Sequence, residues 1–251
     1  MERKGKLESL FFKLKHDSEY LNFGREIIIR QVIEYSARIS ASELRILDIG
    51  LGDGQDIDNI GRHVKDKKVV FAGVECYPPF IELASRKGIQ VFPINIEREP
   101  IPLPDQSCDI IIANQVIEHT KEIFWIFGEL SRVLKKQGIL IIGMPNLSSL
   151  HNRILLLWGH QPACIKPLSE HVRGFTKPSL ESFISCGGYF KLTRYLGANF
   201  YPFPPWISRR LSRFLPTFST ALIYVVTRTE KDGNFISILD SGYELTPYFK
   251  G

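Results

Sequence analysis

Short apolar runs alternate with helix-forming segments through the middle of the chain, and this alternation limits the possible folds more than any other feature. Five runs predict strands, at residues 45–49, 69–75, 91–95, 108–114 and 139–145. Helix candidates lie between several of them, at Gln55–His63, Pro79–Lys87 and Lys121–Lys135. Strands that alternate with helices form a mainly parallel sheet that is covered on both faces. We therefore expect a doubly wound α/β fold.

Residues on either side of this alternation predict a small helical cap. Residues 1–44 carry apolar positions at roughly helical spacing, among them Ile28, Val32 and Ile39. Residues 146–178 carry Pro, His, Trp and Asn with one short apolar run, which fits a cap insertion better than a linker. We expect both stretches to belong to the cap.

The C-terminal part of the chain predicts two further strands. A helix is expected at residues 179–185, and strands at residues 189–196 and 221–228, which brings the sheet to seven strands. The main domain is then expected at residues 45–230. Residues 231–251 are expected to form a loosely attached C-terminal tail.

The composition is that of an ordinary globular protein, with 44% apolar and 24% charged residues. No apolar run approaches the roughly 18 residues of a membrane span, and the N-terminal residues lack the apolar core of a secretory signal. Four cysteines stand far apart without CxxC spacing, so we expect no metal site and free thiols in a reducing compartment. The net charge of +5 is spread over mixed acidic and basic residues, which argues against a nucleic-acid partner. These features predict a soluble cytoplasmic protein.

The stretch ILDIGLGDGQD places three glycines within five residues, directly after the first apolar run. Gly50, Gly52 and Gly54 let a ligand approach the backbone with no Cβ in the way. The helix that follows exposes unpaired N–H groups. In a doubly wound sheet, this first strand-to-helix turn is where a nucleotide-like ligand lies. We expect a ligand here, and a tight turn without one is the alternative.

The spacing of these glycines departs from the dinucleotide fingerprint GxGxxG, because the third glycine comes one place early. Asp53 and Asp56 add negative charge where a pyrophosphate would lie. An acidic turn favours a cationic or zwitterionic ligand, and Asp48, just before the turn, could face an ammonium group. An enzyme that uses NAD is therefore the less favoured alternative.

The turn resembles motif I of class I S-adenosylmethionine-dependent methyltransferases, acid-x-Gly-x-Gly-x-Gly. Four more stretches resemble methyltransferase domains of the type 11 and type 12 kind, in the same order along the chain. They are VVFAGVE, IPLPDQSCDIIIANQVIEHT, LSRVLKKQGILIIGMPN and SEHVRGFTKPSLESFISCGGYF. The resemblance covers roughly residues 44–195. It implies the seven-stranded, Rossmann-like methyltransferase fold, with S-adenosyl-L-methionine as the cofactor.

The resemblance also implies which residues bind the cofactor. They are Asp48, Gly50, Leu51, Gly52, Gly54, Glu75, Cys76, Asn95, Ile96 and Asn114. The glycine turn would lie along the methionine and ribose moieties, and Asn114 would touch the methionine part through its backbone. Glu75 would accept from both ribose hydroxyls, and Cys76 would border the adenine. Asn95 stands where the family usually has Asp; its carbonyl oxygen can still accept, and a turn residue at a strand end is the alternative.

Two histidines are the candidate catalytic residues. His119 follows the fourth strand, close to where the methyl group should point, and it titrates in the useful range. His171 lies in the HVRGFT segment, where it could act as a base in an acceptor pocket with Arg173 as an anion contact. Structural roles are the alternatives: the EH pair as a helix start, and His171 with Arg173 as a tie that holds the cap.

The expected function is methyl transfer by in-line displacement to a small-molecule or glycan-type acceptor, at oxygen. The stretch PNLSSLHNRILLLWGHQP, followed by HVRGFT, resembles methyltransferases of bacterial surface-glycan and secondary-metabolite pathways. The acceptor class rests on that analogy, because a fold does not dictate a substrate. A protein that binds the cofactor without catalysis is the alternative.

The segment PPWISRRLSRFLP, residues 204–216, is both aromatic and basic. We expect Trp206, Ile207, Leu211 and Phe214 to bury one face of a helix while the arginines stay solvated. The alternative is contact with a membrane surface or a lipid-linked acceptor.

Overall fold

A computed structural model describes residues 18–240, so the start of the expected cap and residues 241–251 of the expected tail lie outside the described residues. Seven strands form one sheet in the order β3-β2-β1-β4-β5-β7-β6. They are β1 (Glu43–Ile49), β2 (Lys68–Val74), β3 (Gln90–Phe92), β4 (Cys108–Asn114), β5 (Leu134–Pro145), β6 (Phe190–Ala198) and β7 (Ala221–Arg228). The strand β7 runs antiparallel to the other six strands. The predicted seven-stranded, mainly parallel α/β fold is confirmed.

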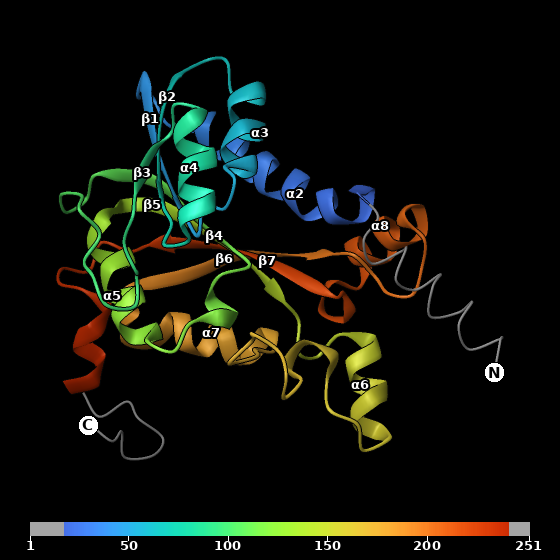
Figure 1. The fold of residues 1–251 in the computed structure, drawn as a ribbon. Helices are drawn as coiled ribbons and strands as arrows, with labels where there is room; N and C mark the ends of the chain where they lie inside the picture. The colour runs from blue at the N-terminus through green and yellow to red at the C-terminus, as the bar shows by residue number, and fades with distance from the viewer. Residues whose placement is uncertain (1–17, 241–251) are drawn as a thin grey trace.

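Helices cover both faces of this sheet (Figure 1). The α-helices are α2 (Ser18–Ser36), α3 (Gln55–His63), α4 (Pro78–Arg86), α5 (Ile123–Val133), α6 (Leu150–Leu157), α7 (Lys177–Ser185) and α8 (Pro205–Phe214). Short 3-10 helices are η1 (Ile117–His119), η2 (Ala163–Ile165), η3 (Cys186–Gly188), η4 (Pro216–Phe218) and η5 (Phe235–Asp240). One core lies between the sheet and α5, α7 and η5, and the other lies between the sheet and α2 and α3. The expected cap stretch 146–178 contains α6 and η2.

The central strand β4 shows why these residues form a sheet. Its sequence CDIIIAN is apolar on both sides, as expected for a parallel strand with helices above and below. Ile110 and Ile112 pack into the core beneath α2 and α3, whereas Ile111 and Ala113 pack into the core beneath α5 and α7. All four are fully buried. Their alternation reflects the two-residue period of a strand.

The strand β5 begins earlier than the sequence predicts. It starts at Leu134, within the helix expected over residues 121–135, and α5 ends at Val133. The pairing of β4 with β5 shifts register between Cys108 and Ile110. At this irregularity, a Cβ on Gly138 would lie 2.9 Å from the carbonyl oxygen of Asp109. The local backbone therefore depends on a glycine contact that sequence periodicity does not reveal.

The expected loose tail is wrong for its described part. Phe235 and Ile238 in η5 are 0% and 3% exposed and pack in the core beside α5. The backbone N–H of Phe235 donates to the hydroxyl of Ser131 at 2.8 Å. Gly128 on α5 lets Ile236 approach, because an added Cβ there would lie 3.3 Å from the Cβ of Ile236. These contacts make residues 235–240 part of the domain.

The expected burial of α8 is wrong for two of its four apolar residues. Trp206 and Phe214 are 66% and 77% exposed, and the helix turns Ser208 and Ser212 inward instead. The small face lets α8 lie close to β6, where a Cβ on Gly197 would stand only 2.7 Å from the carbonyl oxygen of Ser212. Close approach of the backbones therefore decides which face is buried.

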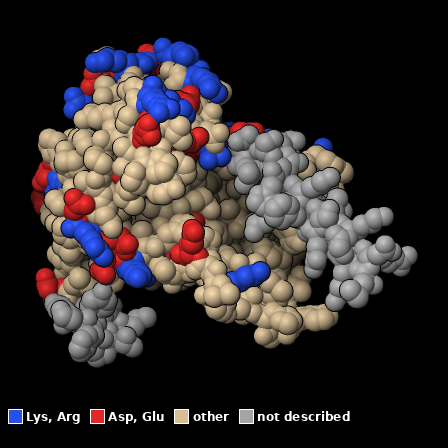
Figure 2. Space-filling model, in the orientation of Figure 1, with Lys and Arg blue, Asp and Glu red and all other residues tan. Residues whose placement is uncertain are grey.

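Charged side chains on the face drawn in Figure 2 are mixed in sign. Lys and Arg gather at the top of this face with some Asp and Glu among them, and the centre carries few charges. Among the described residues, no helix combines the length and the apolar character that crossing a membrane requires.

Candidate functional site

The carboxyl ends of the central parallel strands place the predicted site residues along one edge of the sheet. In the sheet register, Asp48 of β1 is level with Gly73 of β2 and with Ile112 of β4. Strand order reverses between β1 and β4, and such switch points are where open α/β sheets bind ligands. The glycine turn follows β1, Glu75 follows β2 and Asn114 ends β4. The fold therefore brings these residues to a common edge.

The three positions of the turn require glycine for different reasons. All have positive φ angles, of 67°, 56° and 81° at Gly50, Gly52 and Gly54. A Cβ on Gly50 would lie 2.5 Å from Val116, and one on Gly54 would lie 2.6 Å from Ile89. A Cβ on Gly52 would meet no atom within 4 Å. Packing thus explains the first and the third glycine, whereas Gly52 opens onto free space that suits a ligand.

The carboxylate of Glu75 is held against this turn. It accepts hydrogen bonds from the backbone N–H groups of Gly52, Cys76 and Tyr77, at 2.8, 2.8 and 2.9 Å. The residue is 8% exposed. A carboxylate has about four acceptor sites, so these three bonds fix its position and leave room for another donor. Its role as the ribose ligand stays a prediction.

Acidic residues beneath the turn are balanced by a cation from α2. Asp48 is 2% exposed, and burial raises its pKa well above the ordinary value, with Asp56 adding to the rise and Arg25 opposing it. The Nε of Arg25 lies 2.9 Å from Asp56. The side-chain amide of Asn114 donates to the other oxygen of Asp56 at 3.0 Å. Sequence reasoning missed Arg25, because nothing local links α2 to the turn.

The other predicted cofactor residues are placed mainly by packing and turn geometry. Leu51 is 4% exposed and packs against Gly73, and Ile96 is 8% exposed in the core. The side-chain oxygen of Asn95 accepts from the backbone N–H of Glu97 at 3.0 Å, as a turn residue at a strand end does. Cys76 is exposed. Contacts of these residues with a cofactor stay predictions.

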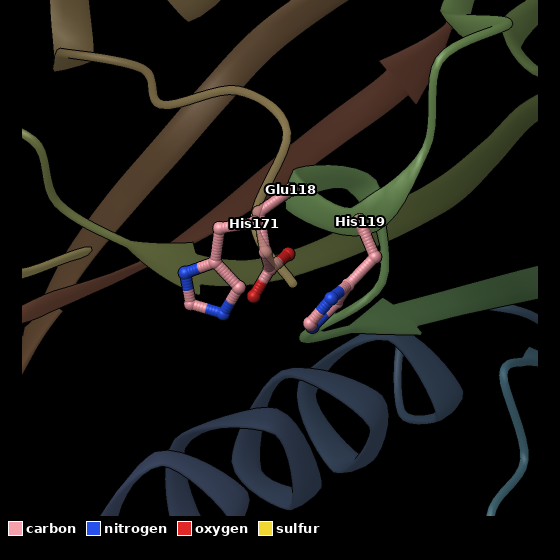
Figure 3. A group of neighbouring side chains, drawn as sticks. All are labelled: Glu118, His119 and His171. Carbon is pink, nitrogen blue, oxygen red and sulfur yellow. The ribbon is translucent and has the colours of Figure 1, made fainter. Parts of the chain in front are cut away.

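A buried carboxylate and two imidazoles converge just beyond β4 (Figure 3). Glu118 and His119 lie in η1, and His171 comes from the segment between α6 and α7. One potential ligand atom from each residue lies within 4.8 Å of the other two. The two rings are 4.6 Å apart between centroids and meet edge to face at 79°. The fold thus brings the two predicted catalytic histidines together and adds Glu118.

The segment that carries His171 is fastened to η1 through its backbone. The carbonyl oxygen of Glu118 accepts from the N–H groups of Val172 and Arg173, at 2.9 and 3.3 Å. The guanidinium of Arg173 donates to the carbonyl oxygens of Thr120 and Lys121, at 2.9 and 2.7 Å. These bonds match the structural alternative for Arg173, which is to hold the cap in place.

Burial controls the protonation of this group. Glu118 is 1% exposed, and neither of its carboxylate oxygens has a hydrogen-bond partner among the described residues. Desolvation raises the pKa of Glu118 to about 7. Burial and the neighbouring His171 lower the pKa of His119, while Glu170 opposes this shift. The sequence predicted a site at the Glu118–His119 pair, but only the structure shows that Glu118 is buried.

Comparisons with known proteins identify the fold of this chain. Residues 47–142 match the family model described as a methyltransferase domain. The crystal structure of the CurJ carbon methyltransferase has a TM-score of 0.59 at 15% identity, covering 82% of this chain and 54% of that chain. A possible histamine N-methyltransferase from Thermotoga maritima has a TM-score of 0.57 at 19% identity, covering 88% of this chain and 99% of that chain. At such identities, likeness to solved structures shows the fold.

The curated relatives are matched only in part. An uncharacterised protein of Methanocaldococcus jannaschii is 31% identical over 119 residues, which is 47% of this chain and 53% of that protein. The chain spans between 31% and 53% of the length of the curated relatives it matches. Residues 47–142 therefore match a methyltransferase domain, and the solved methyltransferase structures share the fold of this chain. These matches support the expected family and, with it, S-adenosylmethionine as the cofactor.

Replacing Glu118 by Gln is expected to raise the free energy of unfolding more at about pH 8 than at about pH 5. Folding raises the pKa of this carboxyl from 4.5 to about 7. The wild-type chain therefore loses stability as the pH rises between these values, by on the order of 3 kcal/mol, and a neutral amide does not. Urea unfolding with a chelator present measures the difference. Glu82→Gln, at an exposed position of α4, is the control. Equal effects at both pH values would contradict the raised pKa.

Proposed function

We propose that this chain is a methyltransferase that uses S-adenosylmethionine to methylate a hydroxyl oxygen of a small-molecule or glycan-type acceptor. The observation that carries the proposal is the open space before Gly52, beside the fixed carboxylate of Glu75. It lies at the strand-order reversal, in the domain that matches the methyltransferase family. The family match identifies neither the acceptor nor the atom that is methylated. The proposal for both rests on Glu118, His119 and His171.

The residues at the sheet edge fit the proposed cofactor. Gly52 would let the ligand lie against the backbone, and Glu75 has acceptor capacity left for a hydroxyl. A cofactor that carries an ammonium and a sulfonium group would stabilise the charged form of Asp48, which burial and Asp56 otherwise disfavour. Bound there, S-adenosylmethionine supplies a methyl group activated by a positively charged sulfur.

The acceptor is proposed to bind beside Glu118, His119 and His171. Val116, which packs against Gly50, is two residues before Glu118, so this group borders the glycine turn. The Nδ1 of His171 lies 2.6 Å from the carbonyl oxygen of Cys164. A carbonyl only accepts, so Nδ1 carries the hydrogen and Nε2 of the neutral ring keeps a lone pair. We propose that His171 orients an acceptor hydroxyl and takes its proton, with His119 beside it.

The membrane contact given above as the alternative for residues 204–216 also belongs to this proposal. Trp206, Arg210, Arg213 and Phe214 are exposed at positions that recur on one face of α8. Aromatic and basic residues on one exposed face suit contact with an anionic membrane surface. A cytoplasmic location stays a prediction, and nucleic acid forms no part of the proposal.

Gly52→Ala is expected to weaken binding of S-adenosylhomocysteine by roughly 10-fold or more, because a methyl group would enter the space of the ligand. Gly88→Ala is the matched control. Gly88 also has a positive φ, of 76°, and free space around an added Cβ, but it lies at the end of α4. Calorimetric titration of both variants, with NAD beside S-adenosylhomocysteine, makes the measurement. Absence of S-adenosylhomocysteine binding in the wild type, or equal loss in both variants, would contradict the assigned cofactor site.

His171→Ala is expected to lower turnover by about 10²–10⁴-fold, the range that a positioned base contributes, with little change in S-adenosylhomocysteine affinity. Release of S-adenosylhomocysteine is measured over a panel of hydroxyl acceptors. His160→Ala, at an exposed histidine of the cap stretch, is the control. Unchanged turnover would remove His171 from the acceptor site. Cofactor binding without turnover on any acceptor would favour the non-catalytic alternative.

Removing the aromatic residues of α8 is expected to abolish sedimentation with anionic vesicles. Trp206 and Phe214 are replaced together by Ala, which costs little stability because both side chains are exposed. Trp158→Ala, at a residue of the cap stretch that is 75% exposed, is the control. If the wild type sediments no better with anionic vesicles than with zwitterionic ones, the membrane contact is wrong.

A further inference from the structure

We infer that Glu118, His119 and His171 bind a divalent first-row transition-metal ion. This site goes beyond the proposed methyl transfer, and the sequence analysis expected no metal. The three residues offer two imidazole nitrogens and a carboxylate oxygen, all within 4.8 Å of one another. Figure 3 shows the carboxylate of Glu118 beside the two rings.

The unpartnered carboxylate is the observation that points to a cation. Glu118 is 1% exposed, and both of its oxygens lack a hydrogen-bond partner among the described residues. Buried carboxylates are normally paired, hydrogen-bonded or bound to a metal, because burying an unpaired charge costs several kcal/mol. A proton on one oxygen would still leave the other oxygen without a partner. An ion in the group would satisfy the carboxylate and both rings at once.

The imidazole of His171 is arranged as a metal ligand. Its Nδ1 donates to the carbonyl oxygen of Cys164 at 2.6 Å, so Nε2 carries the free lone pair. Histidine ligands in proteins typically donate their second ring N–H to a carbonyl or a carboxylate in this way, which fixes the tautomer and the ring orientation.

The backbone already holds the ligands near a binding geometry. The carbonyl oxygen of Glu118 accepts from the N–H groups of Val172 and Arg173, so the segment that carries His171 is fixed against η1. Around a tetrahedral ion with bonds of about 2.0–2.2 Å, ligand atoms lie roughly 3.2–3.6 Å apart. Closing the present group onto an ion therefore takes side-chain shifts of about 1 Å, which rotation about side-chain bonds can supply.

The donor set decides which ions fit. Two imidazoles and one carboxylate suit Zn²⁺, Fe²⁺, Co²⁺ or Mn²⁺, whereas Mg²⁺ and Ca²⁺ prefer oxygen ligands alone. Three protein ligands leave a coordination position open, as in catalytic rather than structural sites. That position would take the acceptor hydroxyl and lower its pKa, so that the hydroxyl would lose its proton to water, and His171 would then act as a ligand instead of a base. This role rests on the proposed function, whereas metal binding does not.

Titration of the chelator-treated full chain with Co²⁺ tests the site directly. We expect one Co²⁺ per chain, with visible absorption bands that Zn²⁺ abolishes by competition and Mg²⁺ does not. Glu118→Gln and His171→Ala should each weaken Co²⁺ binding by at least the roughly 10–100-fold that loss of a ligand's supporting partner costs. Glu118→Gln keeps the shape of the side chain, so it separates loss of the ligand from loss of the fold.

Two controls make the outcome specific. His160→Ala should bind Co²⁺ like the wild type, because this histidine is exposed and outside the group. Alkylating the exposed Cys76 should leave the bands unchanged, since no thiol belongs to the site. The inference would be overturned if the wild type does not bind Co²⁺. It would also be overturned if Glu118→Gln and His171→Ala bind Co²⁺ as tightly as the wild type. S-adenosylhomocysteine binding, measured on the same samples, is expected to persist in Glu118→Gln; its absence in the wild type would overturn the proposed function and leave the metal site standing.

Discussion

Burial of β4 on both faces fixes the residue at which this strand ends. The position of that end in turn sets where the candidate functional residues that follow β4 lie. The four apolar residues from Ile110 to Ala113 fill the two cores alternately. A slip of one residue would exchange the two faces and draw Asp109 or Asn114 into an apolar core, which is costly for a polar group without partners. Asn114 therefore ends the strand at the sheet edge, and η1 begins three residues later. The tie from Asn114 to Asp56 then joins β4 to the start of α3.

The glycine turn and η1 depend on one another through packing. Position 50 must be glycine because Val116 occupies the space that a side chain would need there. The same contact sets the distance between the turn, where a cofactor fits, and the buried group of Glu118, His119 and His171. In the proposed function, this packing and the register of the parallel strands would hold a bound cofactor near the acceptor. Polar chemistry is arranged here by apolar packing.

Local sequence patterns predicted most of the helices and strands. They did not predict features that depend on contacts between distant parts of the chain. The strands at residues 108–114 and 221–228 and the helix Gln55–His63 agree with the structure residue for residue. Their periodicity and flanking residues are strong local signals. The start of β5, the buried face of α8 and the packing of η5 were mispredicted, because each depends on a close approach of backbone from another part of the chain. Gly138, Gly197 and Gly128 permit those approaches, and a glycine gives no periodic signal.

The sequence by itself determined the order of strands and helices, the glycine turn after the first strand and the family to which that turn points. These features depend on short, contiguous stretches of sequence, so the periodicity of apolar residues and the residue types are enough to predict them. Only the tertiary structure decided that Arg25 neutralises Asp56 and that Glu118 lies buried beside His119 and His171. Both arrangements join segments that are far apart in the chain. Their energies come from desolvation and close charge contact, which exist only after the chain has folded.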